Sequence, residues 1–271
     1  MSRTKESSGP VCVGVDASAG SRDALALGRL LAERMGAPLV AVHVETDEKR
    51  GEFDALSVDA DLRTVRGSSG AEGLQQLGAA EGASLLVVGS SSRTGLERVR
   101  PGETATRLLS GASISVAVAP LNYAKHDSDM SIVGCAYDGG EASASALRWA
   151  VDLCAERPEM KLEVLSVVPR LAFGGTTVGG LSSQTAQAAL GKAIQESLDA
   201  AVEDAADPSA IRGVRLAGNP VMALVTESQR LDLLVLGSRG RGPARSVLLG
   251  SVSTEVVRAA ACPVVVVARS T

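Results

Sequence analysis

The stretch from Leu231 to Arg269 constrains the fold of this chain more than any other. It reads LDLLVLGSRGRGPARSVLLGSVSTEVVRAAACPVVVVAR. An unbroken apolar run, 233–236, ends at a glycine, and a second such run, 264–267, follows a proline. Short apolar runs without polar alternation are typical of strands buried on both faces, as in parallel sheets. A helical run, 251–261, separates them, so the stretch predicts a strand, a glycine-rich loop, a helix and a strand.

The loop carries three glycines at fixed spacing. Gly237, Gly240 and Gly250 form the pattern Gly-x2-Gly-x9-Gly, and Ser251 follows directly. Glycine lets a backbone approach a phosphate closely, and the free N–H groups of the next helix point at it. The pattern is not a P-loop, because the chain has no Gly-Lys-[Ser/Thr]. A glycine-rich turn that binds no ligand remains the alternative.

The same order of elements occurs twice along the chain. Both halves have an aspartate eight residues before an Ala-Leu pair, and both have glycines at the ends of the matching loop. Between these anchors the first half is shorter by about 26 residues. The matching positions are Asp16, Ala24, Gly89 and Gly102 in the first half and Asp138, Ala146, Gly237 and Gly250 in the second.

Alternating strand and helix patterns predict β-α-β units and hence a parallel sheet. Strands are expected over 11–15, 39–44, 61–65, 85–88, 115–119, 132–136, 161–168, 211–216, 233–236 and 264–267. Helices are expected over 24–35, 71–80, 104–109, 144–154, 183–205, 221–230 and 251–261, with Ser18 to Ser21 able to cap the first and Gly36 ending it.

The glycine spacing, with LDLLVLGSRGRG before it and CPVVVVAR after it, resembles the nucleotide-binding signature of the universal stress proteins. The resemblance implies an α/β fold of two tandem doubly wound, Rossmann-like domains, each with a five-stranded parallel sheet. It also implies that the domains form a pseudo-twofold pair within the chain, joined through their last strands, 115–119 and 264–267. Both strands are apolar edges that need covering.

The domain organisation follows from the repeat and the resemblance. Residues 1–10 are polar, which predicts a disordered tail, and 11–120 read as an abridged domain with a degenerate nucleotide motif. A polar linker, 121–130, separates this part from a second domain, 131–271, whose motif is intact.

Three pieces of the second half are expected to meet where strand order reverses: the ends of its first two strands and the glycine loop. The resemblance places Asp138 and the backbone of Val167 at the adenine of ATP, Gly237 and Gly240 at the ribose and phosphates, and the following helix start at the phosphates. The predicted nucleotide-binding residues are Asp138, Val167, Gly237, Arg239, Gly240, Gly250, Ser251, Val252 and Ser253.

Each assignment has a structural alternative. Asp138 could instead cap a helix or lie in a surface loop, and Val167 could be an ordinary core residue. Arg239, with Arg241 and Arg245, suits phosphate oxygens but could instead be a solvated loop residue. Tyr137 could stack on a base or fill the core.

The first half departs from the signature at two positions. Ser92 replaces the second glycine, and Glu103 replaces the hydroxyl residue after Gly102. A carboxylate in the first turn suits the helix dipole, but it also adds negative charge where ATP brings its own. Arg93 and Arg98 are the nearby residues that could offset this charge. The sequence therefore predicts an impaired first site.

Composition limits the other classes of function. The net charge of −4 and the pI of about 5.4 argue against binding to nucleic acid or to a membrane surface. The start has no apolar signal segment, no run of 18 apolar residues occurs, and the four cysteines lack zinc-ligand spacing. These features predict a cytoplasmic protein without a metal site of its own.

The resulting hypothesis is a stress-response regulator or sensor that binds ATP, with or without Mg²⁺, in its second domain. No catalytic residues are identified, since neither a P-loop lysine nor an evident general base is present. A very slow ATPase and a nucleotide-free interaction scaffold are the alternatives. The sequence leaves open whether two chains form a homodimer.

Overall fold

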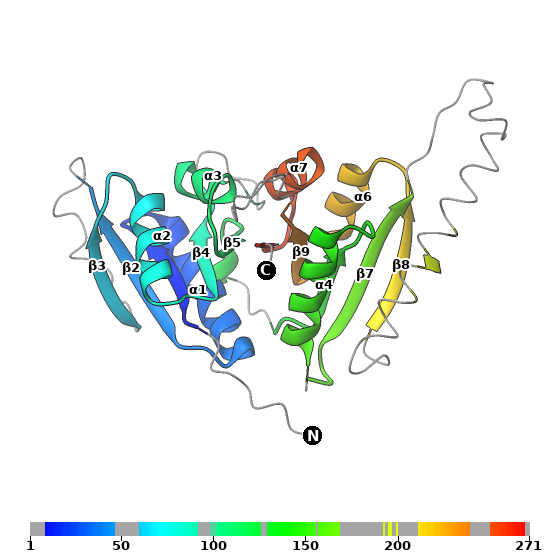
Figure 1. The fold of residues 1–271 in the computed structure, drawn as a ribbon, viewed down its shortest axis with the longest axis horizontal. Helices are drawn as coiled ribbons and strands as arrows, with labels where there is room; N and C mark the ends of the chain where they lie inside the picture. The colour runs from blue at the N-terminus through cyan, green and yellow to red at the C-terminus, as the bar shows by residue number, and fades with distance from the viewer. Residues whose placement is uncertain are drawn as a thin grey trace.

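Strands and helices alternate along the chain in the computed structural model (Figure 1). The structure describes residues 9–46, 60–91, 99, 101–125, 129–155, 157–168, 192, 195–196, 199, 211–238 and 250–268. The strands are β1 (Val11–Val15), β2 (Leu39–Glu45), β3 (Asp61–Arg66), β4 (Leu85–Gly89), β5 (Ser115–Ala119), β6 (Ile132–Ala136), β7 (Lys161–Val168), β8 (Ile211–Ala217), β9 (Leu233–Gly237) and β10 (Val264–Val267). The helices are α1 (Ala19–Met35), α2 (Gly70–Ala80), α3 (Glu103–Leu109), the 3₁₀ turn η1 (Tyr123–Lys125), α4 (Glu141–Cys154), α6 (Pro220–Glu227) and α7 (Ser251–Ala259).

All ten strands form one sheet in the order β3-β2-β1-β4-β5-β10-β9-β6-β7-β8. Neighbouring strands within each half are parallel. The halves meet at β5 and β10, which pair antiparallel with Val264 opposite Val118 and Val266 opposite Val116. Every residue of these two strands is buried. This arrangement confirms two five-stranded parallel sheets joined through their last strands, with matching strand order in the two halves.

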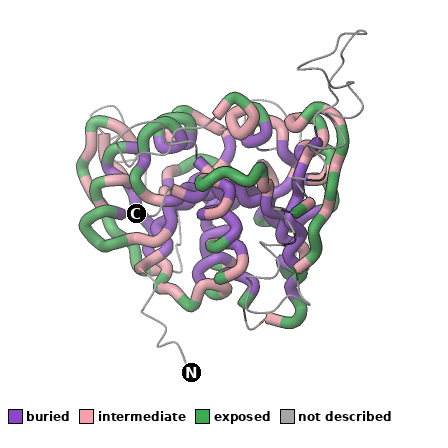
Figure 2. Tube along the Cα trace, turned by 45° about the vertical axis from the view of Figure 1, so that its right-hand side comes forward, coloured by how far each residue is buried: buried purple, intermediate pink, exposed green. Residues whose placement is uncertain are grey.

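Each face of the sheet has its own hydrophobic core. The core on the side of α1 and α4, the two-helix core, includes Val13 and Val235. The core on the side of α2, α3, α6 and α7, the four-helix core, includes Leu86 and Leu234. Successive residues of a strand point to opposite faces, so every central strand supplies side chains to both cores. The buried residues, purple in Figure 2, therefore lie mostly in the middle of the molecule.

The four cysteines lie in these cores as free thiols. Burial raises the pKa of Cys12 and of Cys154 to about 11, and that of Cys262 to about 12. The thiolate is the reactive form. These side chains therefore behave as small apolar residues.

The first helix begins earlier than its apolar pattern predicts. It starts at Ala19 rather than at residue 24, and Ser18 occupies the capping position without a side-chain capping bond. Its first turns hold a buried carboxylate, Asp23, whose two oxygens accept hydrogen bonds from the backbone of Asn122 and Ala124. The predicted stop at Gly36 is confirmed, with φ of 61° in the left-handed region.

Two predicted segments fall mostly or wholly outside the described residues. Of the helix expected over 183–205 only four residues are described, and they are helical: Lys192, Gln195, Glu196 and Asp199. Of the tail expected over 1–10, only residues 9 and 10 are described.

The ends of β4 and β9 both require glycine for packing. A methyl group on Gly89 would overlap the backbone of Gly20 in α1, and one on Gly237 would overlap the backbone of Ala142 in α4. The helix that follows the first strand of each half therefore rests directly on the strand at the motif. The first glycine of the motif, Gly89 or Gly237, is therefore required for packing in both halves.

Replacing Gly89 by alanine should therefore destabilise the chain. Overpacking a tight site typically costs about 1–3 kcal/mol, and a backbone contact cannot relax as a side chain can. Urea unfolding of the purified protein would measure the loss. Gly111→Ala is the matched control, because Gly111 is exposed and its added methyl would meet only Arg107 O, at 3.8 Å. Equal stability of both variants would contradict this account of the glycine.

Candidate functional site

The second half reverses its strand order between β6 and β9. From β6 the chain moves outward through β7 and β8, and it then returns to the other side of β6 at β9. In open α/β sheets, ligands bind outside the carboxyl ends of the strands at such a switch point. The carboxyl ends of β6 and β9 are followed by Asp138 and Ser238, respectively. The predicted site is therefore centred on this edge of the sheet.

Asp138 is held in a local hydrogen-bond network after β6. Its Oδ1 accepts hydrogen bonds from the Ser143 hydroxyl at 2.8 Å and from the Gly140 backbone N–H at 3.0 Å. The first half repeats the network, with Asp16 Oδ1 bound by the Ser21 hydroxyl at 2.8 Å and by the Ser18 N–H at 2.9 Å. The aspartate thus fixes the turn between strand and helix in both halves. Ser143 and Ser21 lie five residues after each aspartate, a spacing visible in the sequence.

Val167 lies half-buried in β7, opposite Leu216 of β8. Its side chain packs against the four-helix core, the side on which α7 lies. The sheet register gives Val44 of β2 the matching place in the first half. Tyr137 packs instead against the two-helix core, on the other face of the sheet. The structure therefore favours the core role for this tyrosine over stacking on a base.

A side chain of the second strand of each half also contacts the backbone carbonyl that directly precedes the aspartate. The Ser166 hydroxyl donates to the Tyr137 carbonyl oxygen at 2.7 Å. In the first half His43 Nδ1 lies 3.2 Å from the Val15 carbonyl oxygen. Both side chains are buried. Different residues thus anchor the same turn.

The start of α7 presents backbone donors without a competing acid. Gly250 occupies the capping position, no side chain caps the helix, and its first turn holds no acidic residue. Ser251 is exposed, whereas Val252 and Ser253 are half-buried. The first N–H groups of a helix have no partner within it and carry the positive end of the dipole. The arrangement suits a phosphate group.

The loop between β9 and α7 lies outside the described residues. It contains Arg239, Gly240, Arg241 and Arg245, so their predicted phosphate contacts stay predictions.

The first half places a carboxylate at the matching helix start. Glu103 follows Gly102, lies in the first turn of α3, and pairs with Arg107 at 2.7 Å. Two positions further on, the counterpart of Ser253 is Ala105, which is buried. The first half therefore lacks the hydroxyls that Ser251 and Ser253 provide in the second. The sequence interpretation noted Glu103 but missed Ala105, although the equal spacing from Gly102 and Gly250 shows it. Ser92, Arg93 and Arg98 lie outside the described residues.

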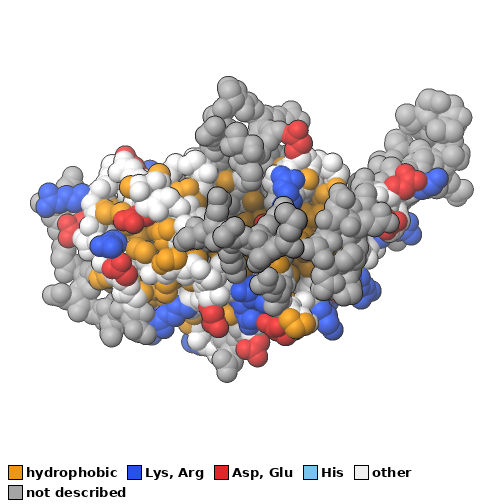
Figure 3. Space-filling model, turned by 60° about the horizontal axis from the view of Figure 1, so that its bottom comes forward, with side chains coloured by type: hydrophobic (Ala, Val, Ile, Leu, Met, Phe, Trp, Pro, Cys, Tyr) orange, Lys and Arg blue, Asp and Glu red, His pale blue; other side chains and the backbone are white. Residues whose placement is uncertain are grey.

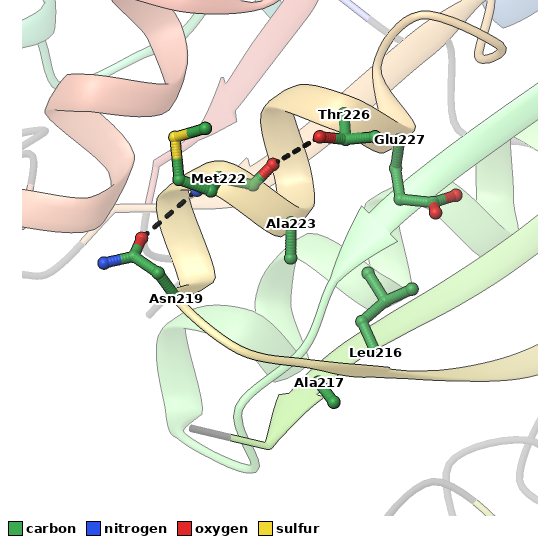
Figure 4. Close-up of a pocket in the computed structure, with 7 residues that line it drawn as sticks. All are labelled: Leu216, Ala217, Asn219, Met222, Ala223, Thr226 and Glu227. Atoms are coloured by element: carbon green, nitrogen blue, oxygen red, sulfur yellow. Dashed lines mark hydrogen bonds between the residues drawn. The ribbon is translucent and has the colours of Figure 1, made fainter. Parts of the chain in front are cut away.

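A shallow pocket lies further out along the same edge, between β8 and α6, beside the β7–β8 pair in which Leu216 lies opposite Val167 (Figure 4). Small and apolar side chains dominate its lining, with Met222 exposed and Asn219 capping α6 through bonds to the N–H groups of Val221 and Met222. The residues around it are Leu216, Ala217, Asn219, Met222, Ala223, Thr226 and Glu227. Glu227 is the sole charged residue among these, so the pocket offers no cationic group for a phosphate.

Several absences hold for the part of the chain that the structure describes. It contains no group of three or more His, Cys, Asp or Glu residues that could hold a metal ion. It also contains no helix of the length and hydropathy needed to cross a membrane. On the face drawn in Figure 3, described acidic and basic side chains lie interspersed rather than in one patch.

Removing the Ser143 hydroxyl should destabilise the second half. A hydrogen bond to a charged group contributes about 1.5–3 kcal/mol, so Ser143→Ala should lower the free energy of unfolding by roughly this amount. Ser21→Ala should act alike in the first half, because its bonds to Asp16 match. Urea titrations would measure both. Ser110→Ala serves as control, since its exposed hydroxyl bonds only to the Thr106 carbonyl of its own helix. If Ser143→Ala and Ser21→Ala lower the free energy of unfolding no more than Ser110→Ala does, the aspartates do not depend on these serines.

Comparison with known proteins gives a family from the sequence and a shared fold from solved structures. The model of the universal stress protein family matches residues 58–120 and 130–268. A universal stress protein of Arabidopsis thaliana is 35% identical over 163 residues, covering 50% of this chain and 60% of that protein. One from Mycobacterium tuberculosis is 32% identical over 130 residues, covering 48% and 46%. The matches thus span less than two thirds of these relatives' length.

Solved structures agree in fold. The crystal structure of a universal stress protein from Archaeoglobus fulgidus superposes with a TM-score of 0.67 at 18% identity, covering 96% of this chain and 98% of that one. A putative universal stress protein from Pseudomonas aeruginosa gives a TM-score of 0.66 at 16% identity, with coverages of 95% and 91%. At these identities the similarity concerns the fold alone. Because the family model covers most of its length in two segments, this chain belongs to the universal stress protein family.

Proposed function

We propose that this protein binds ATP, with or without Mg²⁺, in its second half and acts as a stress-response regulator whose conformation or partners depend on the nucleotide. In this proposal 131–271 form the binding domain, and 11–120, joined through the linker 121–130, form a domain whose own site is impaired. Residues of the second domain position the nucleotide, and none is assigned a catalytic role.

One observation carries the proposal. At the same position of the same fold, α7 opens with Gly250 and Ser251 and has no acid in its first turn, whereas α3 opens with Gly102 and Glu103. The first donors of a helix favour an anion, and a carboxylate beside them competes for the same place. The contrast supports a phosphate site in the second half and a weakened one in the first.

The size of this electrostatic difference can be bounded. A carboxylate about 4 Å from a phosphate charge costs about 1 kcal/mol in water and about 4 kcal/mol at an effective dielectric constant of about 20. These energies correspond to binding that is weaker by about fivefold to about a thousandfold. Glu103 is exposed and paired with Arg107, which moves the expected penalty toward the lower value.

The proposed contacts come from the strand ends at the switch point, from the glycine loop and from the start of α7. Asp138 and the backbone of Val167 lie at the adenine, while Gly237, Gly240 and Arg239 lie along the ribose and phosphates. The start of α7 holds the remaining phosphate oxygens through Gly250, Ser251, Val252 and Ser253. The proposal for Gly237 concerns its backbone only, because the α carbon faces α4.

Calorimetric titration with ATP should give a stoichiometry near one per chain. Gly250→Val should abolish binding, because a branched side chain at the helix start blocks the approach of the phosphates. Gly102→Val is the matched change at the equivalent capping position of α3 and should leave the affinity unchanged.

The other outcomes of this titration each reject part of the proposal. Two equal sites would contradict the role given to Glu103. A single site lost with Gly102→Val but kept with Gly250→Val would place the nucleotide in the first half. No binding by the parent protein, checked for folding by circular dichroism, would reject nucleotide binding and favour a nucleotide-free scaffold.

A further inference from the structure

The hydroxyl of Ser238 is buried without a hydrogen-bond partner. Ser238 directly follows β9, and 1% of its surface is exposed. Its Oγ has no hydrogen-bond partner, although its backbone N–H donates to the Val267 carbonyl oxygen at 3.1 Å. Among the described residues, a buried serine hydroxyl in this state occurs only here. Burying an unpaired hydroxyl is costly, so such a group in a folded protein calls for an explanation.

The first half shows what this hydroxyl does when it serves the fold. Ser90 follows β4 as Ser238 follows β9, and its N–H donates to the Ala119 carbonyl oxygen at 3.1 Å. The Ser90 hydroxyl donates to the same oxygen at 2.7 Å. The equivalent acceptor for Ser238, the Val267 carbonyl oxygen, receives the Ser238 N–H but not its hydroxyl. The two halves thus have the same residue in the same backbone setting, but only the first uses its hydroxyl internally.

The sheet geometry places the Ser238 side chain on the side of α7. Side chains alternate along a strand, and the α carbon of Gly237 faces α4 in the two-helix core. Leu234 and Leu236 point the other way, into the four-helix core, which also holds Val256 of α7. Ser238 continues this second row at the carboxyl end of the strand. Its hydroxyl therefore lies at the switch point on the face that carries the start of α7.

We propose that Ser238 Oγ donates a hydrogen bond to a phosphate oxygen of the bound nucleotide. This inference rests on the proposed function and adds a ligand residue at a position that the Gly-x2-Gly-x9-Gly-Ser pattern leaves unspecified. A phosphate oxygen suits the position because the start of α7, on the same face of the sheet, offers donors and positive potential to an anion. In this account a phosphate oxygen of the nucleotide is the hydrogen-bond acceptor that the Ser238 hydroxyl lacks in the protein itself.

The variant Ser238→Ala tests the assignment through two readouts of opposite sign. Without nucleotide, its melting temperature should rise, because the change removes a buried unpaired polar group. Its affinity for ATP and ADP should fall about tenfold to a hundredfold, the effect of one hydrogen bond to a charged group. Its affinity for adenosine, which has no phosphate, should equal that of the parent.

Ser90→Ala is the matched control in the first half. It loses a satisfied hydrogen bond, so its melting temperature should fall while its ATP affinity stays at the parent value. Differential scanning fluorimetry gives the melting temperatures of the two variants of this chain, and calorimetry gives their affinities.

Three results would overturn the assignment. A lower melting temperature for nucleotide-free Ser238→Ala would give the hydroxyl a structural role. Unchanged ATP affinity in this variant, with normal binding by the parent, would remove Ser238 from the site while leaving the proposed function intact. An equal loss for adenosine would move the contact from the phosphates to the nucleoside. If the parent itself fails to bind ATP, the proposed function fails first and this inference fails with it.

Discussion

The antiparallel pair between β5 and β10 is the interaction on which the rest of this structure depends. Each strand is buried along its whole length, and each would otherwise end its half as an exposed apolar edge. Exposed edges of this kind pair with other chains. Here each edge covers the other within one chain, so ten strands form a single sheet. Since the two halves have the same strand order, each residue of one half can be compared with the residue at the same position of the other.

That comparison isolates the chemistry from the fold. Elements that hold the frame are kept in both halves. They are the aspartate after the first strand with its serine five residues later, and the glycine at the end of β4 or β9, which is pressed against α1 or α4. Elements that would meet a phosphate differ. Ser251 and Ser253 stand where the first half has Glu103 and Ala105. A fold constraint alone gives no reason for this difference, whereas one working nucleotide site and one impaired site would account for it.

The sequence predicted the strands well because their signal is local. Buried strands of parallel sheets are continuous apolar runs, and all ten lie within one residue of their expected limits. The start of α1 was predicted five residues late, because its first turns hold polar residues whose burial depends on a distant partner. Asp23 accepts bonds from residues 99 and 101 positions away, which no local pattern reveals.

The candidate site was predictable in part for the same reason. The glycine spacing marks the loop and helix start, and the strand ends give Asp138 and Val167. The pattern does not show that Gly237 is required by α4, that Tyr137 faces the opposite core, or that Ser238 differs from Ser90. Each of these facts depends on which atoms a buried group meets in three dimensions.

Hydrogen exchange followed by mass spectrometry, with and without ATP, tests the central claim most directly. The first amides of a helix lack partners within it and exchange fast until a ligand covers them. The account predicts that ATP slows exchange in peptides covering 250–253 and leaves those covering 102–105 unchanged, both in the unmodified chain. Protection at 102–105 instead, or at neither helix start under saturating ATP, would contradict it.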